Sequence, residues 1–130
     1  MYIAIDFDGT CVTHEYPYIG KDIGAVPVLR KIVEAGHKII LHTMRAGKEA
    51  EEAENWFRDH QLPLFGINNN KTQWRWTKSK KVFAHLYIDD AALGAPLKID
   101  PRLSERPFYD WEIAEKMLED IGVIKKEEEK

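Results

Sequence analysis

The stretch Tyr-Ile-Ala-Ile-Asp-Phe-Asp-Gly-Thr, residues 2–10, decides the fold. An apolar run ends in two carboxylates, Asp6 and Asp8, which are followed by a glycine and a hydroxyl. A strand that is apolar on both faces is typical of a covered parallel sheet, and such sheets place ligands at the carboxyl ends of their strands. Alternation along the strand directs both aspartates to one side while Phe7 turns toward the core. Two acids at one strand end repel each other unless a cation or a proton lies between them, so the stretch predicts a metal-dependent site.

The composition fits one soluble globular domain. The chain has 130 residues, of which 44% are apolar and 32% charged, a balance that allows both a buried core and a solvated surface. We assign residues 1–124 to a single domain and residues 125–130 to a disordered charged tail. No apolar run reaches membrane-spanning length and the first residues lack a signal-peptide pattern, so we expect a cytoplasmic protein with no membrane partner.

The number of cysteines and the net charge exclude some classes of protein. The single cysteine, Cys11, excludes an internal disulfide and fits a reducing compartment. The formal net charge of −3 argues against a general electrostatic attraction to nucleic acid, although basic residues are frequent between positions 71 and 81. Nucleic acid is therefore a partner that the sequence does not favour.

Strand and helix patterns alternate along the rest of the chain. Strands are predicted at residues 2–6, 37–43, 64–67 and 85–88, and helices at residues 23–35, 48–60, 79–84 and after Asp110. The side chains of the last helix that are expected to face inward are Ile113, Met117, Leu118 and Ile121. This order of elements predicts an α/β fold, a three-layer Rossmann-like parallel sheet flanked by helices.

Polar side chains follow three of the predicted strands. Asp6 and Asp8 end the first strand, Thr43 ends the second, and Asp89 with Asp90 ends the fourth. Because right-handed crossovers bring the carboxyl ends of parallel strands to one edge of the sheet, these groups should meet there. Four carboxylates at close range favour a hard divalent cation with oxygen ligands, for which Mg²⁺ is the natural candidate.

Two lysines precede the fourth strand. Lys80 and Lys81 fall in the first turn of the helix predicted at residues 79–84, where a cation opposes the helix dipole unless an anion lies in front of it. An ion, a lysine and a hydroxyl together form a receptor for a phosphoryl group. A neighbouring carboxylate could attack phosphorus and form an aspartyl-phosphate, while a second acid protonates the leaving group.

These residues resemble the four motifs of the haloacid dehalogenase (HAD) superfamily. The matching segments are Asp-Phe-Asp-Gly-Thr at 6–10, the strand ending at Thr43, the lysine ahead of the fourth strand and Ile-Asp-Asp at 88–90. The resemblance extends over residues 1–124 and is greatest to small bacterial and phage HAD hydrolases. Those hydrolases are similar to this chain in Asp-Ile-Gly-Ala-Val-Pro at 22–27, Leu-Gly-Ala-Pro-Leu at 93–97 and Arg-Pro-Phe-Tyr-Asp-Trp at 106–111.

The resemblance implies roles for the four aspartates. Asp6 would be the nucleophile and Asp8 the general acid and base. Asp6, the backbone carbonyl of Asp8, and Asp89 would hold Mg²⁺, with Asp90 assisting directly or through water. An aspartate as the first-motif nucleophile is the pattern of phosphohydrolases, so the resemblance implies a Mg²⁺-dependent phosphatase acting on a phosphorylated substrate.

Further positions are candidates for contact with the phosphoryl group or the substrate. By resemblance, Thr43 would donate a hydrogen bond to the phosphoryl oxygens. Lys81, whose spacing from the fourth motif fits better than that of Lys80, would neutralise charge on the intermediate. We also expect Gly9 and Thr10, directly after the acid pair, to contact the substrate.

The chain looks like a HAD protein without a cap domain. Only the short segment 11–21 follows the first motif, where larger relatives carry a cap. Capless relatives either accept bulky phosphorylated substrates or borrow a lid from a neighbouring subunit. The resemblance therefore leaves a homo-oligomer open.

Three side chains have two interpretations each. Arg45 could reach a substrate phosphate, or it could serve a helix cap or the surface. Trp74 and Trp76, in a polar loop with Arg75 between them, could stack on a base or a sugar. They could equally pack on the sheet as ordinary loop anchors. If Trp74 and Trp76 stack on a base or a sugar, the alternative function is a nucleotide or nucleic-acid-end phosphatase.

Two classes of protein without hydrolase activity compete with the phosphatase. A phosphorylation-switched receiver domain also uses an acid pair, a hydroxyl and a lysine, but its acceptor aspartate ends the third strand, where this chain has Asn68. A non-catalytic phosphate-binding module on the same scaffold would have no need of every group that the motifs supply. Both alternatives are weaker than the enzyme.

Overall fold

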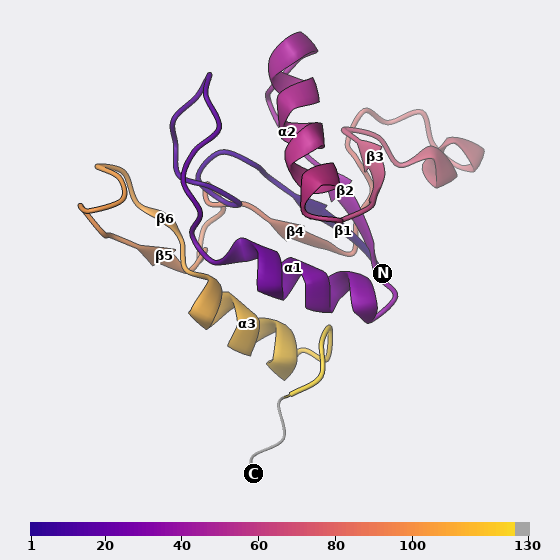
Figure 1. Ribbon diagram of the computed structural model, residues 1–130. Helices are drawn as coiled ribbons and strands as arrows, with labels where there is room; N and C mark the ends of the chain where they lie inside the picture. Colours follow the sequence, from indigo (N-terminus) through magenta and orange to yellow (C-terminus); the bar gives the residue numbers. More distant parts are fainter. Residues whose placement is uncertain (127–130) are drawn as a thin grey trace.

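A four-stranded parallel sheet forms the centre of the molecule, as the computed structural model shows for residues 1–126. The strands are β1 (Tyr2–Ile5), β2 (Lys38–Leu41), β3 (Leu64–Ile67) and β4 (Leu86–Ile88), in the order β3-β2-β1-β4 (Figure 1). β1 is therefore an interior strand that pairs with β2 on one side and β4 on the other. The predicted α/β fold with a parallel, Rossmann-like sheet flanked by helices is confirmed.

Three helices share the apolar core with one face of the sheet. They are α1 (Ala25–Glu34), α2 (Gly47–Asp59) and α3 (Trp111–Asp120). The core side chains that the strands contribute are Ile3, Ile5, Ile39, Leu41 and Ile88. α3 lies beside α1 (Figure 1), where Lys31 Nζ is 2.9 Å from Glu115 Oε2. Burial of each of these apolar side chains stabilises the fold by about 1.5–3 kcal/mol. The core therefore holds the sheet in place, and with it the polar residues that follow the strands.

The connection from β3 to β4 covers the opposite face. It contains one short 3-10 helix, η1 (Lys71–Arg75). The ring of Tyr2, which projects from this face of β1, lies 5.2 Å from the ring of Phe65 and 6.0 Å from that of Phe83. The connection thereby brings aromatic side chains over the amino end of the sheet, where β1 and β4 begin.

The helix predicted at residues 79–84 is absent, and this prediction was wrong. The buried Gln73 side chain donates to the carbonyls of Ser79 and Lys81 and accepts from the Phe83 N–H. These bonds occupy backbone groups that a helix would have paired internally, so the segment stays irregular.

A second, two-stranded sheet was not predicted. β5 (Leu97–Lys98) pairs antiparallel with β6 (Phe108–Tyr109). Each strand has two residues, which is too short for an alternating pattern to be recognised in the sequence.

The last helix begins as predicted but buries a different set of side chains. Asp110 caps it by accepting from the N–H groups of Glu112 and Ile113. The inward side chains are Trp111, Ala114 and Leu118, whereas Ile113, Met117 and Ile121 are each about half exposed, against the prediction. α3 lies at the border of the core beside α1, so only one narrow stripe of the helix is covered.

None of the helices within residues 1–126 is long and apolar enough to cross a membrane. The tail predicted to be disordered falls largely on residues 127–130, which lie outside the described part of the chain.

Candidate functional site

Parallel pairing of β1 with β4 brings three aspartates together. Ile5 is in register with Ile88, and the Asp6 N–H continues the ladder by donating to the Ile88 carbonyl at 2.9 Å. Asp6, Asp89 and Asp90 each offer a carboxylate oxygen, and these oxygens lie within 4.8 Å of one another. The predicted meeting of these acids at the carboxyl edge, where β1 and β4 end, is confirmed. The cluster could hold a metal ion.

Electrostatics in this cluster disfavour three free carboxylates. The pKa of Asp6 is raised to about 8, mainly because the group is buried and further because of its hydrogen bond with Asp90 and the negative charge of Asp89. A cation among these oxygens would relieve the repulsion and release the proton. The donor set, all carboxylate oxygen, fits a hard divalent ion such as Mg²⁺.

The Thr10 hydroxyl orders two of the three acids. It lies 3.1 Å from Asp6 Oδ2 and 3.2 Å from Asp90 Oδ1 as a donor, and it accepts from the Asp90 N–H at 3.0 Å. Since a hydroxyl has one proton, it donates to one carboxylate at a time. Thr10 is fully buried, so the expected contact with substrate is wrong and its role is to position Asp6 and Asp90.

Gly9 also faces the protein rather than the substrate, against the prediction. Its N–H donates to the Val12 carbonyl and its own carbonyl accepts from the Tyr109 N–H. The backbone has φ +82°, and a Cβ here would collide with the ring of His14 and the carboxylate of Asp90. Only glycine allows these groups to approach so closely.

His14 is a neighbour of the site that sequence reasoning missed. Its Nε2 lies 2.9 Å from Asp90 Oδ2. Burial raises the pKa of Asp90, but hydrogen bonds with His14 and Asp6 outweigh that effect, so the pKa is below its usual value. The two residues are 76 positions apart, and no spacing in the sequence connects them.

Asp8 faces Arg45 instead of the other aspartates. Arg45 Nη2 and Nε donate to the two Asp8 carboxylate oxygens at 2.7 and 2.8 Å. The carboxylate therefore lies outside the three-aspartate cluster, and only the expected backbone carbonyl of Asp8 remains as its metal-binding group. Each oxygen keeps a second lone pair for proton transfer.

Arg45 is a structural clamp, so the prediction that it contacts the substrate is wrong. Its remaining N–H groups donate to the backbone carbonyls of Pro17, Tyr18 and Glu49. All five guanidinium N–H groups are thus used, and the side chain is buried. The arginine ties the loop after β1 to the start of α2.

Thr43 ends β2 beside the strand of Asp6, as predicted. Its Oγ1 accepts from the Arg45 N–H at 3.0 Å, and Asn68 holds its backbone through two hydrogen bonds of 2.8 Å. Among residues 1–126, the proton of the Thr43 hydroxyl has no acceptor. The hydroxyl is therefore fixed in place with one donor available.

Lys81 lies on the same face of the sheet as the acids. Its Nζ is 5.6 Å from the centre of the Tyr87 ring. Tyr87 and Asp89 are two residues apart along the strand direction, so their side chains lie on the same face of the sheet. Lys81 is accordingly near the end of β4.

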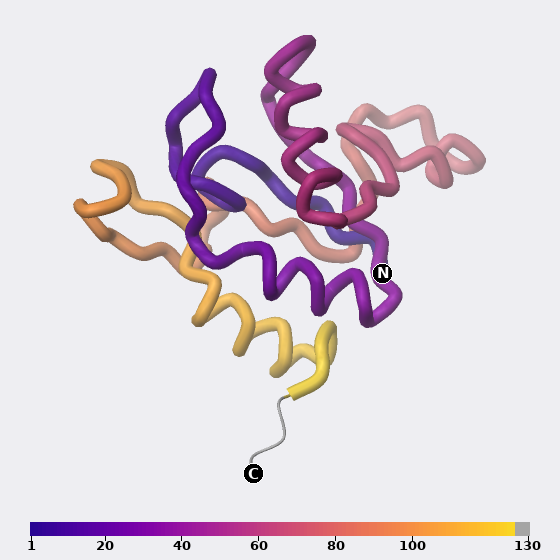
Figure 2. Tube along the Cα trace, viewed as in Figure 1, coloured from indigo at the N-terminus to yellow at the C-terminus, as the bar shows by residue number. Residues whose placement is uncertain are grey.

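Trp76 lies away from the acids, so for Trp76 the expected contact with a base or sugar of the substrate is wrong and the loop-anchor interpretation holds. The Trp76 ring is edge-on to Phe83 at 5.6 Å, and Phe83 contacts Tyr2 at the start of β1. That end is roughly 13 Å from Asp6 at the usual rise of a strand. Trp74 donates to the side chain of Asn69, and the whole segment protrudes on the side opposite the loop after β1 (Figure 2).

The C-terminal part of the chain supports the turn that carries the first acids. The buried Trp111 indole donates to the Thr10 carbonyl at 2.7 Å, and the Tyr109 N–H donates to Gly9. Tyr109 and Trp111 belong to the segment 106–111 that was noted in the sequence. The structure gives that segment a physical task, which is to hold residues 9–10 in place.

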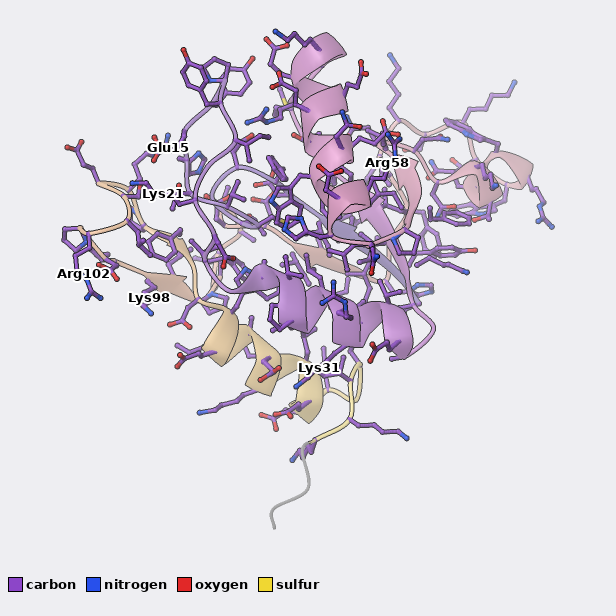
Figure 3. The ribbon with its side chains drawn as sticks, in the orientation of Figure 1. Glu15, Lys21, Lys31, Arg58, Lys98 and Arg102 are labelled. Atoms are coloured by element: carbon purple, nitrogen blue, oxygen red, sulfur yellow. The ribbon has the colours of Figure 1, made fainter. Side chains whose placement is uncertain are left out.

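A polar cleft of about 300 Å³ is lined in part by His14, the partner of Asp90, although none of the three aspartates lines it. It opens between the loop after β1 and the loop from β5 to β6, with His14, Lys21, Glu105 and Arg106 among its lining residues. Lys21 Nζ crosses between the two loops and donates to the Leu103 carbonyl. In Figure 3, Lys21 comes from the first loop and Arg102 from the second, on one side of the molecule.

Comparison with known proteins gives one relative of established structure. No family model and no curated protein matches the chain. A solved structure of a conserved protein from Bacteroides thetaiotaomicron is 34% identical, with a TM-score of 0.75, and the match covers 93% of this chain and 91% of that one. At this identity and coverage the likeness extends beyond a shared fold. The chain belongs to the same family as this conserved Bacteroides thetaiotaomicron protein.

Proposed function

We propose that the protein is a metal-dependent phosphatase that hydrolyses a phosphomonoester through a phospho-aspartate on Asp6. The observation that carries the proposal is the cluster of Asp6, Asp89 and Asp90 at the carboxyl edge, with Thr43 ending the adjacent strand β2. Such a cluster has a cost in charge repulsion that a purely structural role would not require. The HAD-like motifs of the sequence assign the same residues to phosphoryl transfer.

A bound Mg²⁺ would be held by Asp6, Asp89 and Asp90 and would neutralise the phosphoryl oxygens. Thr43 supports the proposal because its free donor is fixed at the end of β2 and suits a phosphoryl oxygen. Lys81 supports it because an ammonium on the same face can balance the negative charge that develops on phosphorus.

The reaction then has two displacements at phosphorus. A carboxylate oxygen of Asp6 forms a bond to phosphorus while the bond to the leaving-group oxygen breaks, and that oxygen takes a proton from Asp8. In the second displacement, water loses a proton to Asp8 and attacks the phospho-aspartate, which releases phosphate and restores Asp6. Arg45 keeps Asp8 in a fixed orientation for both transfers.

The polar cleft beside His14 is a candidate place for the part of the substrate that extends away from the phosphate. It borders His14, which contacts Asp90, and its lining is mixed in charge. The nucleic-acid-end phosphatase is not proposed again, because Trp76 lies at the amino end of the sheet, away from this edge.

The test is hydrolysis of p-nitrophenyl phosphate by the full chain with Mg²⁺ and with a chelator. We expect the chelator to abolish activity and Asp6→Asn to lower it by at least about 10³-fold. Asp59→Asn, an exposed acid at the end of α2, is the matched control and should leave the rate unchanged. An acid quench should trap a phosphorylated wild-type chain that hydroxylamine cleaves. Equal rates for Asp6→Asn and wild type would exclude the mechanism.

A further inference from the structure

The connection from β3 to β4 carries an unusual concentration of positive charge. No acidic residue occurs between Asp59 and Asp89, although the whole chain has a formal net charge of −3. The basic residues in this interval are Lys71, Arg75, Lys78, Lys80 and Lys81. We call residues 69–81 the basic loop. Its charge is opposite to that of the chain as a whole, so it attracts anions locally.

Two tryptophans on the basic loop are largely open to solvent. Trp74 is 50% exposed and Trp76 is 64% exposed. Each is nevertheless fixed in place, Trp74 by its hydrogen bond to Asn69 and Trp76 by the edge-on contact with Phe83. Single exposed apolar side chains are normal on a protein surface, but two exposed rings on one short segment that also carries several cations favour a binding surface.

The backbone beneath these side chains is tightly held. Gln73 is 2% exposed and bonds through its amide to Ser79, Lys81 and Phe83. Asn70 is fully buried and accepts from Thr72 while donating to the Phe83 carbonyl. The basic loop is therefore ordered before any partner arrives, which lowers the entropy cost of binding.

Residues 69–80 of the basic loop are separate from the proposed phosphatase site, which uses only Lys81 at the end of the loop. Figure 2 shows that the basic loop protrudes on the side of the molecule opposite the loop after β1, and the loop after β1 carries His14, which contacts Asp90. A ligand of the basic loop would not need to reach the acids, so the inference does not depend on the proposed activity.

We propose that the basic loop binds single-stranded nucleic acid. Phosphates would pair with Lys78, Lys80 and Arg75, and unpaired bases would stack on the indoles of Trp74 and Trp76. The alternation of planar aromatic surfaces with cations matches the alternation of bases and phosphates in a single strand. An acidic peptide would use the charges but leave the indoles without a partner.

The experiment is a fluorescence-anisotropy titration of the full chain with a labelled twelve-nucleotide single strand. Binding should weaken with salt along a logarithmic slope of about −2 to −3, as expected for three to four phosphate contacts. Trp74→Ala and Trp76→Ala should each weaken binding by roughly 5- to 100-fold. Lys78→Glu with Lys80→Glu should weaken binding further and reduce the salt slope.

Matched controls separate a specific surface from general charge. Tyr18→Ala removes an aromatic side chain that is 76% exposed outside the loop, and Lys48→Glu reverses an exposed charge on α2; neither should change affinity. Circular dichroism of every variant verifies the fold. Absence of binding at about 50 mM salt would overturn the proposal. So would binding to polyglutamate or phosphatidylserine vesicles as tight as to the oligonucleotide and unaffected by the tryptophan substitutions.

Discussion

The acidic carboxyl edge and the basic loop are built in opposite ways. At the acidic edge, Asp6, Asp89 and Asp90 are half buried and are placed by the ladder between β1 and β4. In the basic loop, the buried side chains are Asn70 and Gln73, and the groups that could bind a partner are exposed. The register of the strands determines the geometry of the acidic edge. In the basic loop, hydrogen bonds from the side-chain amides of Asn70 and Gln73 hold the backbone instead. Each surface should therefore respond to a different set of substitutions.

Arg45→Met should have the largest effect on stability, and it acts on the acidic edge. The substitution leaves the carboxylate of Asp8 and three backbone carbonyls without their buried partner, so we expect a loss of about 3–5 kcal/mol in the free energy of unfolding. Denaturant unfolding measures it. Arg58→Met is the control, because that arginine is 69% exposed and its ion pair with Glu54 should contribute less than about 0.5 kcal/mol. Similar losses in the two variants would show that Arg45 is not a clamp.

Thr10→Val tests the order within the acidic cluster. It keeps the volume of the side chain but removes the hydroxyl between Asp6 and Asp90, which should cost about 1–3 kcal/mol of stability. If the hydroxyl only fills space, the variant will unfold at the wild-type denaturant concentration. Oligonucleotide binding to the basic loop should be unaffected in either case.

Gln73→Leu is the corresponding change in the basic loop. It removes three hydrogen bonds to the backbone of residues 79–83, and we expect a loss of about 1–2 kcal/mol together with faster amide exchange confined to residues 70–83. Amide exchange at residues 4–10 should stay at the wild-type rate. Faster exchange at residues 4–10 as well would show that the acidic edge and the basic loop are coupled, and it would contradict the view that they are held independently.

Metal ions should stabilise the acidic edge in a pH-dependent way. In the metal-free protein the pKa of Asp6 is about 8 against 3.8 as the ordinary value, so between these limits the folded state binds a proton that the unfolded state lacks. The free energy of unfolding therefore falls as pH rises through this window. The pKa of Asp90 is lowered, so below that window the free energy of unfolding decreases as pH falls and Asp90 becomes protonated.

Mg²⁺ must displace that proton, so its stabilising effect should be larger at pH 8 than at pH 5. At ten times the dissociation constant, the ion adds about 1.4 kcal/mol. Thermal unfolding with and without Mg²⁺ measures this, and Asp6→Asn should remove both the pH slope and the metal effect. A melting temperature that Mg²⁺ leaves unchanged at pH 8 would mean that the cluster does not bind the ion.

The parts of the site that follow strands could be predicted from the sequence. Asp6, Thr43 and Asp89 each come after an apolar run, and the rules of parallel connection bring such ends to one edge. The parts that lie in loops could not. His14 reaches Asp90 across 76 residues, and Arg45 turns to Asp8 because the loop after β1 folds over it.

The position of the basic loop could not be predicted from the sequence either. Its composition was visible in the sequence, but its place was not, because the connection from β3 to β4 crosses the sheet and carries Trp76 to the amino end. A pattern of polar and aromatic residues contains no information on where an irregular segment ends up.

The α/β fold, the parallel strands and the meeting of aspartates at the carboxyl edge could be predicted from the sequence, although it predicted four carboxylates there and the structure brings three together. These features depend on periodic burial and on the handedness of connections, both of which act over short stretches of chain. The tertiary structure was needed to show that Arg45 and Thr10 contact other parts of the protein rather than a substrate, and that Trp76 lies apart from the acids. Such partnerships arise from side chains meeting across distant loops, where hydrogen-bond satisfaction and packing, not local pattern, select the partner.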